Sequence, residues 1–523
     1  MARRIVWVVC LVFIASLSTA CGDDPEPESS NSIQIEPEPD AGSEPDAEIE
    51  PDADSEPDAD SEPDADSEPD ADPQPDADPQ PDADPLPDAD PIIDPPVPGI
   101  SPSWVGGHSV EDRPIIVEHF GHEGPVLFIL SAIHGTERLS VIYNERFRSA
   151  LNAGYAERHG LQVVHMQATN PDGIAQYIRY NMNGVDLNRN FPTANFIPGG
   201  PGGDEPLSEP EAVAIKNAVD ASGLRAVLTV HCCVPLFDYD GPGQELAQAM
   251  SAAMDPQYRF DAGKLGASNG SLGSYVGLEM NLPIITVEFA RAENMDPVIQ
   301  LNQMDLAFEA AGSWTTQNPG DGTIDFNAMT TEDEWTYRAW FTGRSAAGIP
   351  LRAESIGEAS EERYFLLAGF DGDKQLGTWI AEHIRRELLA VPHLNGAYWR
   401  IVTGANPDGM AAGNGLNQSG IDIKSAIDEG DGSSDEAASI LDMVEGPPAT
   451  IFLVENSPDS IDRVAITGPR AGVLVDLIGT RFQGSPDPDD MLLAESFTAM
   501  GHTVVQIVVG TENAEAQTQS GGL

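Results

Sequence analysis

The chain has 523 residues, of which 86 are Asp or Glu and 26 are Lys or Arg, so its formal net charge at pH 7 is -60. This excess of negative charge excludes a protein that binds nucleic acid through a basic surface. Hydrophobic residues make up 40% of the chain, which is enough for a buried core. The charge is unevenly spread, and residues 1–98 differ in composition from the rest.

Residues 1–20 have the features of a secretory signal peptide, because two arginines precede an apolar run that ends at Leu17. The next residues resemble a bacterial lipobox, in which Cys21 would be lipidated and become the mature N-terminus. Ser18 stands where Leu is usual, and an ordinary signal peptidase could cut the same bond. We expect export, with a lipid anchor at Cys21 in the outer membrane or cell surface. The alternative is a periplasmic or secreted protein.

Residues 21–98 are predicted to hold the lipid-attachment site and a disordered linker. Between Asp23 and Pro98 there are 29 acidic and no basic residues, and Pro-Asp-Ala-Asp recurs from Pro51 to Pro87. Like charges repel and prolines favour extended chain, so this segment cannot build a core. It is interpreted as a stalk, with a passive tail as the alternative. No later stretch has the roughly 18 apolar residues of a membrane span, so membrane contact is expected only through the anchor.

Cysteines are few after the linker, where only the adjacent pair Cys232 and Cys233 remains. Such a pair provides no disulfide framework. We expect two small buried residues at a strand end, and a disulfide between neighbours is the alternative.

The first candidate site follows an apolar run, Val126 to Ala132, of the length and composition of a buried strand. A helix-like segment from Leu139 to Ala153 comes next, as in a βα unit. Between them stand His134 and Glu137. A His and a carboxylate separated by two residues on such a loop can turn toward one cation.

Further polar residues follow other predicted strands. The strand 162–166 leads to Asn-Pro-Asp-Gly at 170–173, and Ser208 with Glu211 forms a predicted capping box before a helix at 213–221. The strand 226–230 ends next to His231, and the strand 283–289 carries Glu288. A lone acid on a buried strand needs a partner or a function.

Together these residues, with Arg179 and Asn183-Gly-Val-Asp-Leu-Asn-Arg-Asn-Phe191, resemble the zinc carboxypeptidase family, also called carboxypeptidase A-like or funnelin. The resemblance covers about Trp104 to Trp314. It implies an α/β/α fold with a mixed sheet. It implies the following site: one Zn²⁺ bound by His134, Glu137 and His231; Glu288 as general base; Arg179 stabilising the oxyanion; Asn188 and Arg189 holding a substrate carboxylate.

The spacing of these motifs is similar to the bacterial branch that contains murein tripeptide amidase. The resemblance therefore implies a peptide or murein stem-peptide substrate. The family's active-site tyrosine has no secure counterpart, because Tyr275 lies only 13 positions before Glu288. The side-chain preference and the oligomeric state are not indicated.

Residues 335–511 look like a second, degenerate copy of the domain predicted at 99–315. Asn-Pro-Asp-Gly recurs at 406–409, and Gly420 lies 11 residues beyond Gly409, as Gly184 does beyond Gly173. Each site residue is expected to be replaced: His134 by Asp371, Glu137 by Lys374, Arg179 by Gly415, Asn188 by Lys424, Arg189 by Ser425, His231 by Glu455 and Glu288 by Gln506. An unrelated α/β domain is the alternative. In the family the active copy folds alone, so we expect binding or regulation rather than a folding role.

The sequence thus predicts an exported zinc metallopeptidase that hydrolyses a bond near a substrate C-terminus by zinc-activated water. One alternative is a peptidoglycan stem-peptide amidase or endopeptidase of the same family. Another is a cell-surface binding protein without turnover, against which the base Glu288 argues.

Overall fold

The computed structural model describes residues 102–266, 268–291, 294–320, 322–329, 337–357, 363–372, 375–390, 397–430, 434–457, 463–467, 492–500 and 502–510. The predicted signal peptide, Cys21 and the acidic linker lie outside these residues. In the described part of the chain, no helix is both long and apolar enough to span a membrane. We call residues 102–329 the first lobe and residues 337–510 the second lobe.

The first lobe is built on an eight-stranded mixed sheet with the order β1-β2-β4-β3-β5-β8-β6-β7. Strands β3, β4, β5 and β8 run parallel to one another, and β1 and β2 pair antiparallel with their neighbours. Strand β6 pairs antiparallel with β8 and parallel with β7. The strands are β1 (Ser103–His108), β2 (Pro114–Phe120), β3 (Val126–Ser131), β4 (Gln162–Met166), β5 (Leu224–Cys232), β6 (Leu236–Asp240), β7 (Asp261–Gly263) and β8 (Ile284–Phe289).

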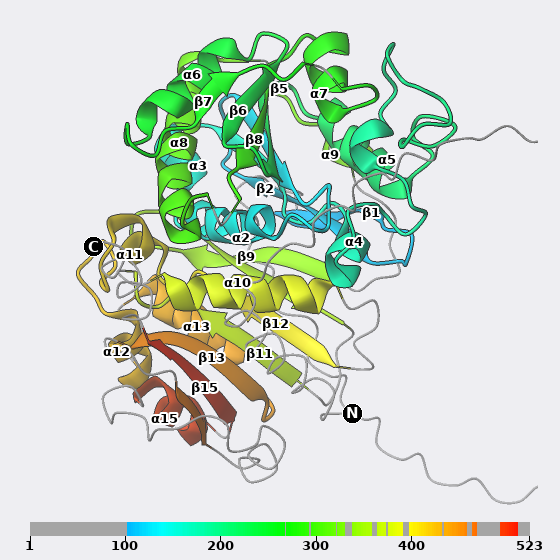
Figure 1. The fold of residues 1–523 in the computed structure, drawn as a ribbon. Helices are drawn as coiled ribbons and strands as arrows, with labels where there is room; N and C mark the ends of the chain where they lie inside the picture. The colour runs from blue at the N-terminus through cyan, green and yellow to red at the C-terminus, as the bar shows by residue number, and fades with distance from the viewer. Residues whose placement is uncertain are drawn as a thin grey trace, which may run out of the picture. The chain divides into compact units, whose positions relative to one another are not determined.

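Helices cover both faces of this sheet (Figure 1). Apolar residues of α2, α6 and α8 pack on one face, and those of α5, α7 and α9 pack on the other. This arrangement confirms the predicted α/β/α fold. The helices are α2 (Arg138–Asn152), α3 (Tyr155–His159), α4 (Pro171–Gln176), η1 (Leu187–Arg189), α5 (Pro210–Asp220), α6 (Gln244–Ala253), α7 (Leu272–Ser274), η2 (Tyr275–Glu279), α8 (Pro297–Gln317) and α9 (Phe326–Met329).

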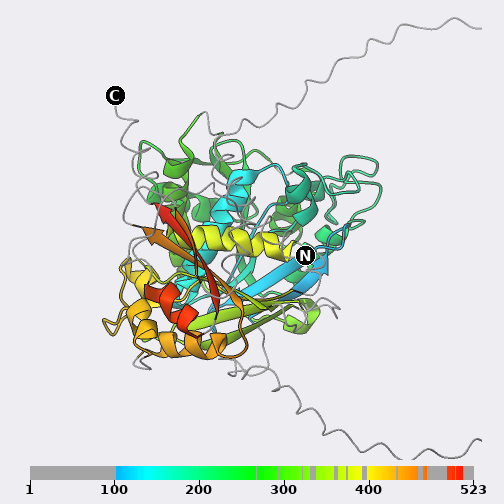
Figure 2. The same cartoon turned by 90° about the horizontal axis from the view of Figure 1, so that it is seen from below.

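The second lobe holds another mixed sheet (Figure 2). Its strand order is β14-β15-β13-β11-β12-β10-β9. Its strands are β9 (Tyr337–Arg344), β10 (Pro350–Ile356), β11 (Arg363–Ala368), β12 (Tyr398–Val402), β13 (Thr450–Ser457), β14 (Arg463–Thr467) and β15 (Thr503–Gly510). Its helices are α10 (Leu376–Leu389), α11 (Pro407–Ala412), α12 (Ile423–Asp428), α13 (Asp435–Val444) and α15 (Leu492–Ala499).

The two sheets have the same connectivity. Reading β9 for β1, β10 for β2, β12 for β4, β11 for β3, β13 for β5, β15 for β8 and β14 for β6 reproduces the order of the first sheet without its last strand. The directions of the paired strands also agree. Shared order and direction are what a duplicated domain requires.

The predicted capping box is wrong. Helix α5 begins after Glu209, which makes no side-chain cap hydrogen bond, and Ser208 Oγ donates to the Glu209 carboxylate. Glu211 instead accepts hydrogen bonds from Asn181 Nδ2 and the Val110 backbone N–H. Long-range partners thus replace the local cap that the sequence pattern favours.

His119 on β2 gives a pH-dependent contribution to stability. Its ring is buried, with Nε2 at 3.1 Å from Gln162 Oε1, and burial lowers its pKa to about 4. The unfolded chain binds the proton more tightly, with a pKa of about 6.5. This stabilisation is therefore present above pH 6.5 and is lost as the pH falls toward 4. Between pH 7 and 5, His119 should lower the free energy of unfolding by about 2 kcal/mol, measured by urea unfolding of metal-free protein.

The His119→Gln variant should lose that part of the pH dependence. The His122→Gln variant, on an exposed turn nearby, should keep the wild-type dependence. Equal slopes for His119→Gln and the wild type would contradict this role of His119.

Candidate active site

The loop between β3 and α2 carries His134 and Glu137, as predicted. Ala132, directly after β3, has a φ of 62°, which turns the chain out of the sheet. Gly135 then passes so close to Gly173 that a Cβ at Gly135 would lie 2.0 Å from the Gly173 carbonyl carbon. Only glycine fits there, and this contact fixes the loop against α4.

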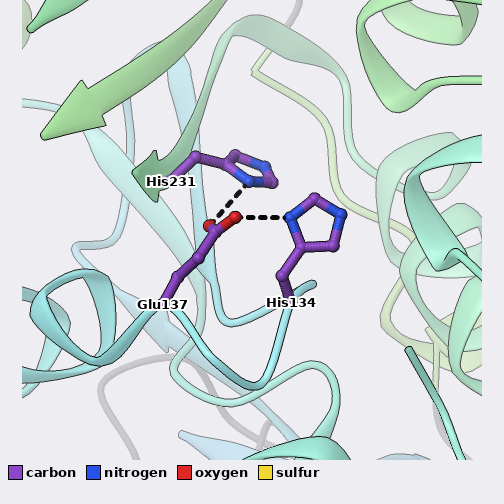
Figure 3. A group of neighbouring side chains, drawn as sticks. All are labelled: His134, Glu137 and His231. Carbon is purple, nitrogen blue, oxygen red and sulfur yellow. Dashed lines mark hydrogen bonds and ion pairs between the residues drawn. The ribbon is translucent and has the colours of Figure 1, made fainter. Parts of the chain in front are cut away.

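Three predicted metal ligands come together in the structure (Figure 3). One potential ligand atom from each of His134, Glu137 and His231 lies within 4.8 Å of the other two, and all three side chains are buried. The Glu137 carboxylate lies between the rings, with Oε1 at 2.7 Å from His134 Nδ1 and Oε2 at 3.0 Å from His231 Nδ1. His231 is delivered by β5.

The outer nitrogen of each ring has its own partner. His134 Nε2 lies 3.0 Å from Asp186 Oδ1, and His231 Nε2 lies 3.0 Å from Thr229 Oγ1. Partners of this kind fix the ring orientation and leave the other nitrogen for a metal. Two imidazoles and one carboxylate form the ligand set of hydrolytic zinc sites, so the residues fit a metal ion.

The pKa values of the two carboxylates at the candidate metal site are set by burial and by the basic groups around them. Burial alone would raise the pKa of Glu137, but His134 and His231 outweigh it and lower the pKa to about 2. Burial likewise opposes ionisation of Asp186, while its hydrogen bond to His134 and the nearby Arg179 lower its pKa. Both carboxylates are therefore ionised at neutral pH.

Glu288 lies beside this group on the neighbouring strand. Residues His231 and Glu288 are direct partners in the parallel register of β5 and β8. Glu288 Oε2 is buried and has no hydrogen-bond partner among the described residues. Burial raises the pKa of Glu288, which makes its carboxylate a stronger base.

Arg179 also reaches the centre. Its guanidinium lies 3.4 Å from Glu137 Oε1 and 3.3 Å from Asp186 Oδ2, and 40% of its side chain remains exposed. The Arg179 guanidinium is therefore held by two carboxylates and is still exposed enough to contact a bound molecule.

Asn188 and Arg189 lie on η1, two and three residues after Asp186. The Asn188 Oδ1 accepts a hydrogen bond from the Leu272 backbone N–H at 3.0 Å, and Arg189 Nη1 donates to the Asn188 carbonyl at 2.6 Å. Asn188 thus uses its oxygen within the fold, while its Nδ2 has no partner among the described residues.

Three residues near the candidate metal site are not part of it. Cys232 and Cys233, next to His231, are joined by a disulfide, so the expectation of two unbonded cysteines is wrong. The Tyr275 hydroxyl donates to Asp220 Oδ1 at 2.6 Å on the side of α5.

Asp186 and Thr229 contact the two candidate histidine ligands, and the sequence predictions did not include them. The position of Asp186 inside the Asn-Gly-Val-Asp-Leu-Asn-Arg motif was the available signal. Thr229 lies two residues before His231 on the same strand, so both side chains point to one face.

An Asp186→Asn variant should bind Zn²⁺ about 10–100-fold more weakly, because the amide cannot replace the carboxylate that orients the His134 ring. Competition with a chromophoric chelator measures this affinity. Asp204→Asn, on the exposed loop after η1, is the matched control and should keep wild-type affinity. Wild-type affinity in Asp186→Asn would contradict the orienting role.

Comparison with known proteins identifies relatives of this chain. A family model described as "Protein of unknown function (DUF2817)" matches residues 119–204. Murein peptide amidase A of Escherichia coli K12 is 31% identical over 180 residues, which is 31% of this chain and 69% of that protein.

Solved structures also match part of the chain. The murein-tripeptide amidase of Escherichia coli O157 is 25% identical, with a TM-score of 0.31, over 41% of this chain and 94% of that one. A metallo-carboxypeptidase from Burkholderia cenocepacia is 18% identical, with a TM-score of 0.31, over 41% and 62%. By its sequence match to the amidase, the chain belongs to the family of murein peptide amidase A and is a hydrolase of the zinc metallocarboxypeptidase type.

Proposed function

We propose that the chain is a zinc metallocarboxypeptidase that hydrolyses a peptide bond near the C-terminus of its substrate, with Glu288 as general base. The observation that carries this is the convergence of His134, Glu137 and His231 with Glu288 on the adjacent strand. A protein that only bound metal would have no need of an unpaired, buried carboxylate at that position.

The residues divide the chemistry among them. His134, Glu137 and His231 would hold one Zn²⁺, which when bound supplies the Lewis acidity that activates water toward a carbonyl. Glu288 accepts the proton of the attacking water and returns it to the leaving amine. Arg179 donates to the oxyanion, where a fixed positive charge stabilises the transition state.

Asn188 and Arg189 would bind the C-terminal carboxylate of the substrate. A guanidinium offers two parallel donors to a carboxylate and stays charged at any physiological pH. The Asn188 Nδ2 supplies another donor from the same turn. We therefore expect a free C-terminal carboxylate on the substrate.

A second candidate substrate is a murein stem peptide, favoured by the 31% identity to murein peptide amidase A. Stem peptides also end in carboxylates, so the same residues would bind them. The two candidates differ in the residues around the cleaved bond and require direct comparison.

Full-length zinc-loaded protein should be incubated with linear peptides and with murein stem peptides, and the products read by mass spectrometry. Release of single C-terminal residues from linear peptides establishes a carboxypeptidase, and cleavage confined to stem peptides establishes a murein amidase. The same peptides with amidated C-termini are the matched controls and should resist. Absence of any zinc-dependent product from both pools would contradict the proposal.

We also propose that the protein is exported and anchored by a lipid at Cys21, which the apolar start and lipobox-like sequence support. The wild type should fractionate with membranes after expression in a Gram-negative host. Cys21→Ser should appear as a soluble or unprocessed protein. If the wild type and Cys21→Ser divided equally between the membrane and soluble fractions, the proposed lipid anchor would be contradicted.

A further inference from the structure

The two lobes share local geometry as well as strand order. Asn170 and Asn406 each cap a short helix by accepting a hydrogen bond at 2.9 Å from the N–H three residues later. Gly372 approaches Gly409 as Gly135 approaches Gly173, with a hypothetical Cβ at 1.9 Å from the glycine carbonyl carbon. The loops that build the metal centre in the first lobe therefore have counterparts in the second.

Strand register identifies the equivalent site residues. Ser131 pairs with Val230 in the first sheet, as Ala368 pairs with Val454 in the second. One residue further on β5 and β13 are His231 and Glu455. Three residues beyond Ser131 and Ala368 are His134 and Asp371.

The same register corrects the expected counterpart of Glu288. His231 pairs with Glu288, whereas Glu455 pairs with Val508, so the base position holds valine and not Gln506. Gln506 lies two residues earlier on β15, and its Nε2 donates to the Glu455 carboxylate. Lys374, the expected counterpart of Glu137, lies outside the described residues.

Lys424 reaches between the two residues that replace the histidines. Its Nζ lies 2.7 Å from Asp371 Oδ1 and 3.3 Å from Glu455 Oε1. In the first lobe the equivalent residue, Asn188, turns its side chain to the Leu272 backbone instead. Burial alone would lower the pKa of Lys424, but Glu455 and Asp371 raise it, so the ammonium group is charged.

We propose that the second lobe is a copy of the first in which the ammonium group of Lys424 takes the place of the metal ion. The chain then holds one zinc ion and has one hydrolytic centre. The ammonium group is a donor to both carboxylates and cannot act as a metal ligand. It also repels a divalent cation from the position between them, at a distance where the repulsion is strong in a partly buried site.

By lying between the carboxylates of Asp371 and Glu455, the Lys424 ammonium would stabilise the second lobe in the absence of a metal ion. Two carboxylates facing one another would be destabilised by like charge and by partial burial. The single ammonium compensates both, and it joins α12 to β13 and to the loop after β11. This inference goes beyond the proposed peptidase activity, because it concerns metal content and stability rather than turnover.

Zinc content tests the proposal directly on the full chain. Equilibrium dialysis should give one zinc per wild-type chain, and none in the double variant His134→Ala with His231→Ala. Two zinc ions per wild-type chain would overturn the proposal. One zinc remaining in the double variant would overturn it as well. Failure to hydrolyse peptides would leave both results unaffected, so the two proposals fail separately.

A second measurement covers the case in which the double variant does not fold. Lys424→Met, which keeps the length of the side chain, should lower the melting temperature by about 5 °C, because it leaves two carboxylates uncompensated. Adding Glu455→Gln to Lys424→Met should recover part of that loss. Lys216→Met, in an exposed pair with Asp220, is the matched control and should melt as the wild type does. An unchanged melting temperature in Lys424→Met would overturn the proposal.

Discussion

A Glu288→Gln variant is expected to lose about 10²–10⁴-fold in kcat and to keep its zinc. Glutamine has nearly the same shape but cannot accept a proton at neutral pH. The ligand atoms come from His134, Glu137 and His231, and Glu288 makes no hydrogen bond to any of them in the structure. The measurement is kcat on a peptide that the wild type cleaves, beside zinc content by atomic absorption.

The matched control is Glu123→Gln, a carboxylate on an exposed turn after β2, which should have wild-type kcat. Should Glu288→Gln retain kcat within a few-fold of the wild type, another group must take the proton. Loss of zinc together with kcat would instead show that Glu288 supports the ligands, and the assignment as base would fail.

The site could be predicted largely because its residues follow strands. His134 comes three residues after the end of β3, and His231 and Glu288 lie near the ends of β5 and β8. In a sheet with parallel central strands, such ends meet at one edge. Apolar runs of strand length therefore indicated both the fold and the place of the site.

Features that depend on long-range partners could not be predicted in the same way. The Ser208 to Glu211 pattern suggested a local cap, but Glu211 is bound by Asn181 and by the turn after β1. The expected counterpart of Glu288, Gln506, lies two positions before Val508, which pairs with Glu455. Most residues of β15 are apolar, and the register of such a strand is not encoded in its own sequence. Pairing with β13 sets it.

The contacts between the two lobes also could not be predicted from the sequence. A group of buried charges joins α2 and β2 of the first lobe to β10 and α10 of the second. Arg148 contacts Glu118 at 2.8 Å, Glu354 at 2.7 Å and Glu382 at 2.7 Å, and Arg385 contacts Glu118 at 3.1 Å and also binds Glu354. All five side chains are at most 2% exposed.

These charges lead us to expect that the second lobe supports folding of the first, which differs from the binding or regulatory role expected above. Without residues 335–523, Glu118 and Arg148 would keep each other but lose Glu354, Glu382 and Arg385. Buried ions left with incomplete partners are costly, because neither water nor an opposite charge compensates them. An apolar cluster crosses the same boundary, since Val105 and Ile116 belong to one cluster with buried apolar residues of the second lobe.

An Arg148→Met variant is therefore expected to lose about 3–5 kcal/mol of unfolding free energy, measured by urea denaturation at neutral pH. The methionine leaves three carboxylates from both lobes facing one another with less positive charge. Helix α2 begins directly after Glu137, so zinc affinity should weaken along with stability.

Lys216→Met, which removes an exposed ion pair within the first lobe, should change the unfolding free energy by less than about 1 kcal/mol. A protein ending at residue 334 should fail to give a folded, zinc-binding monomer, tested by circular dichroism and dialysis. If that shortened protein bound zinc and unfolded at the urea concentration of the full chain, the buried charges would not be what holds the first lobe together. The second lobe would then need another function. If it fails, as expected, the first lobe needs the second lobe in order to fold.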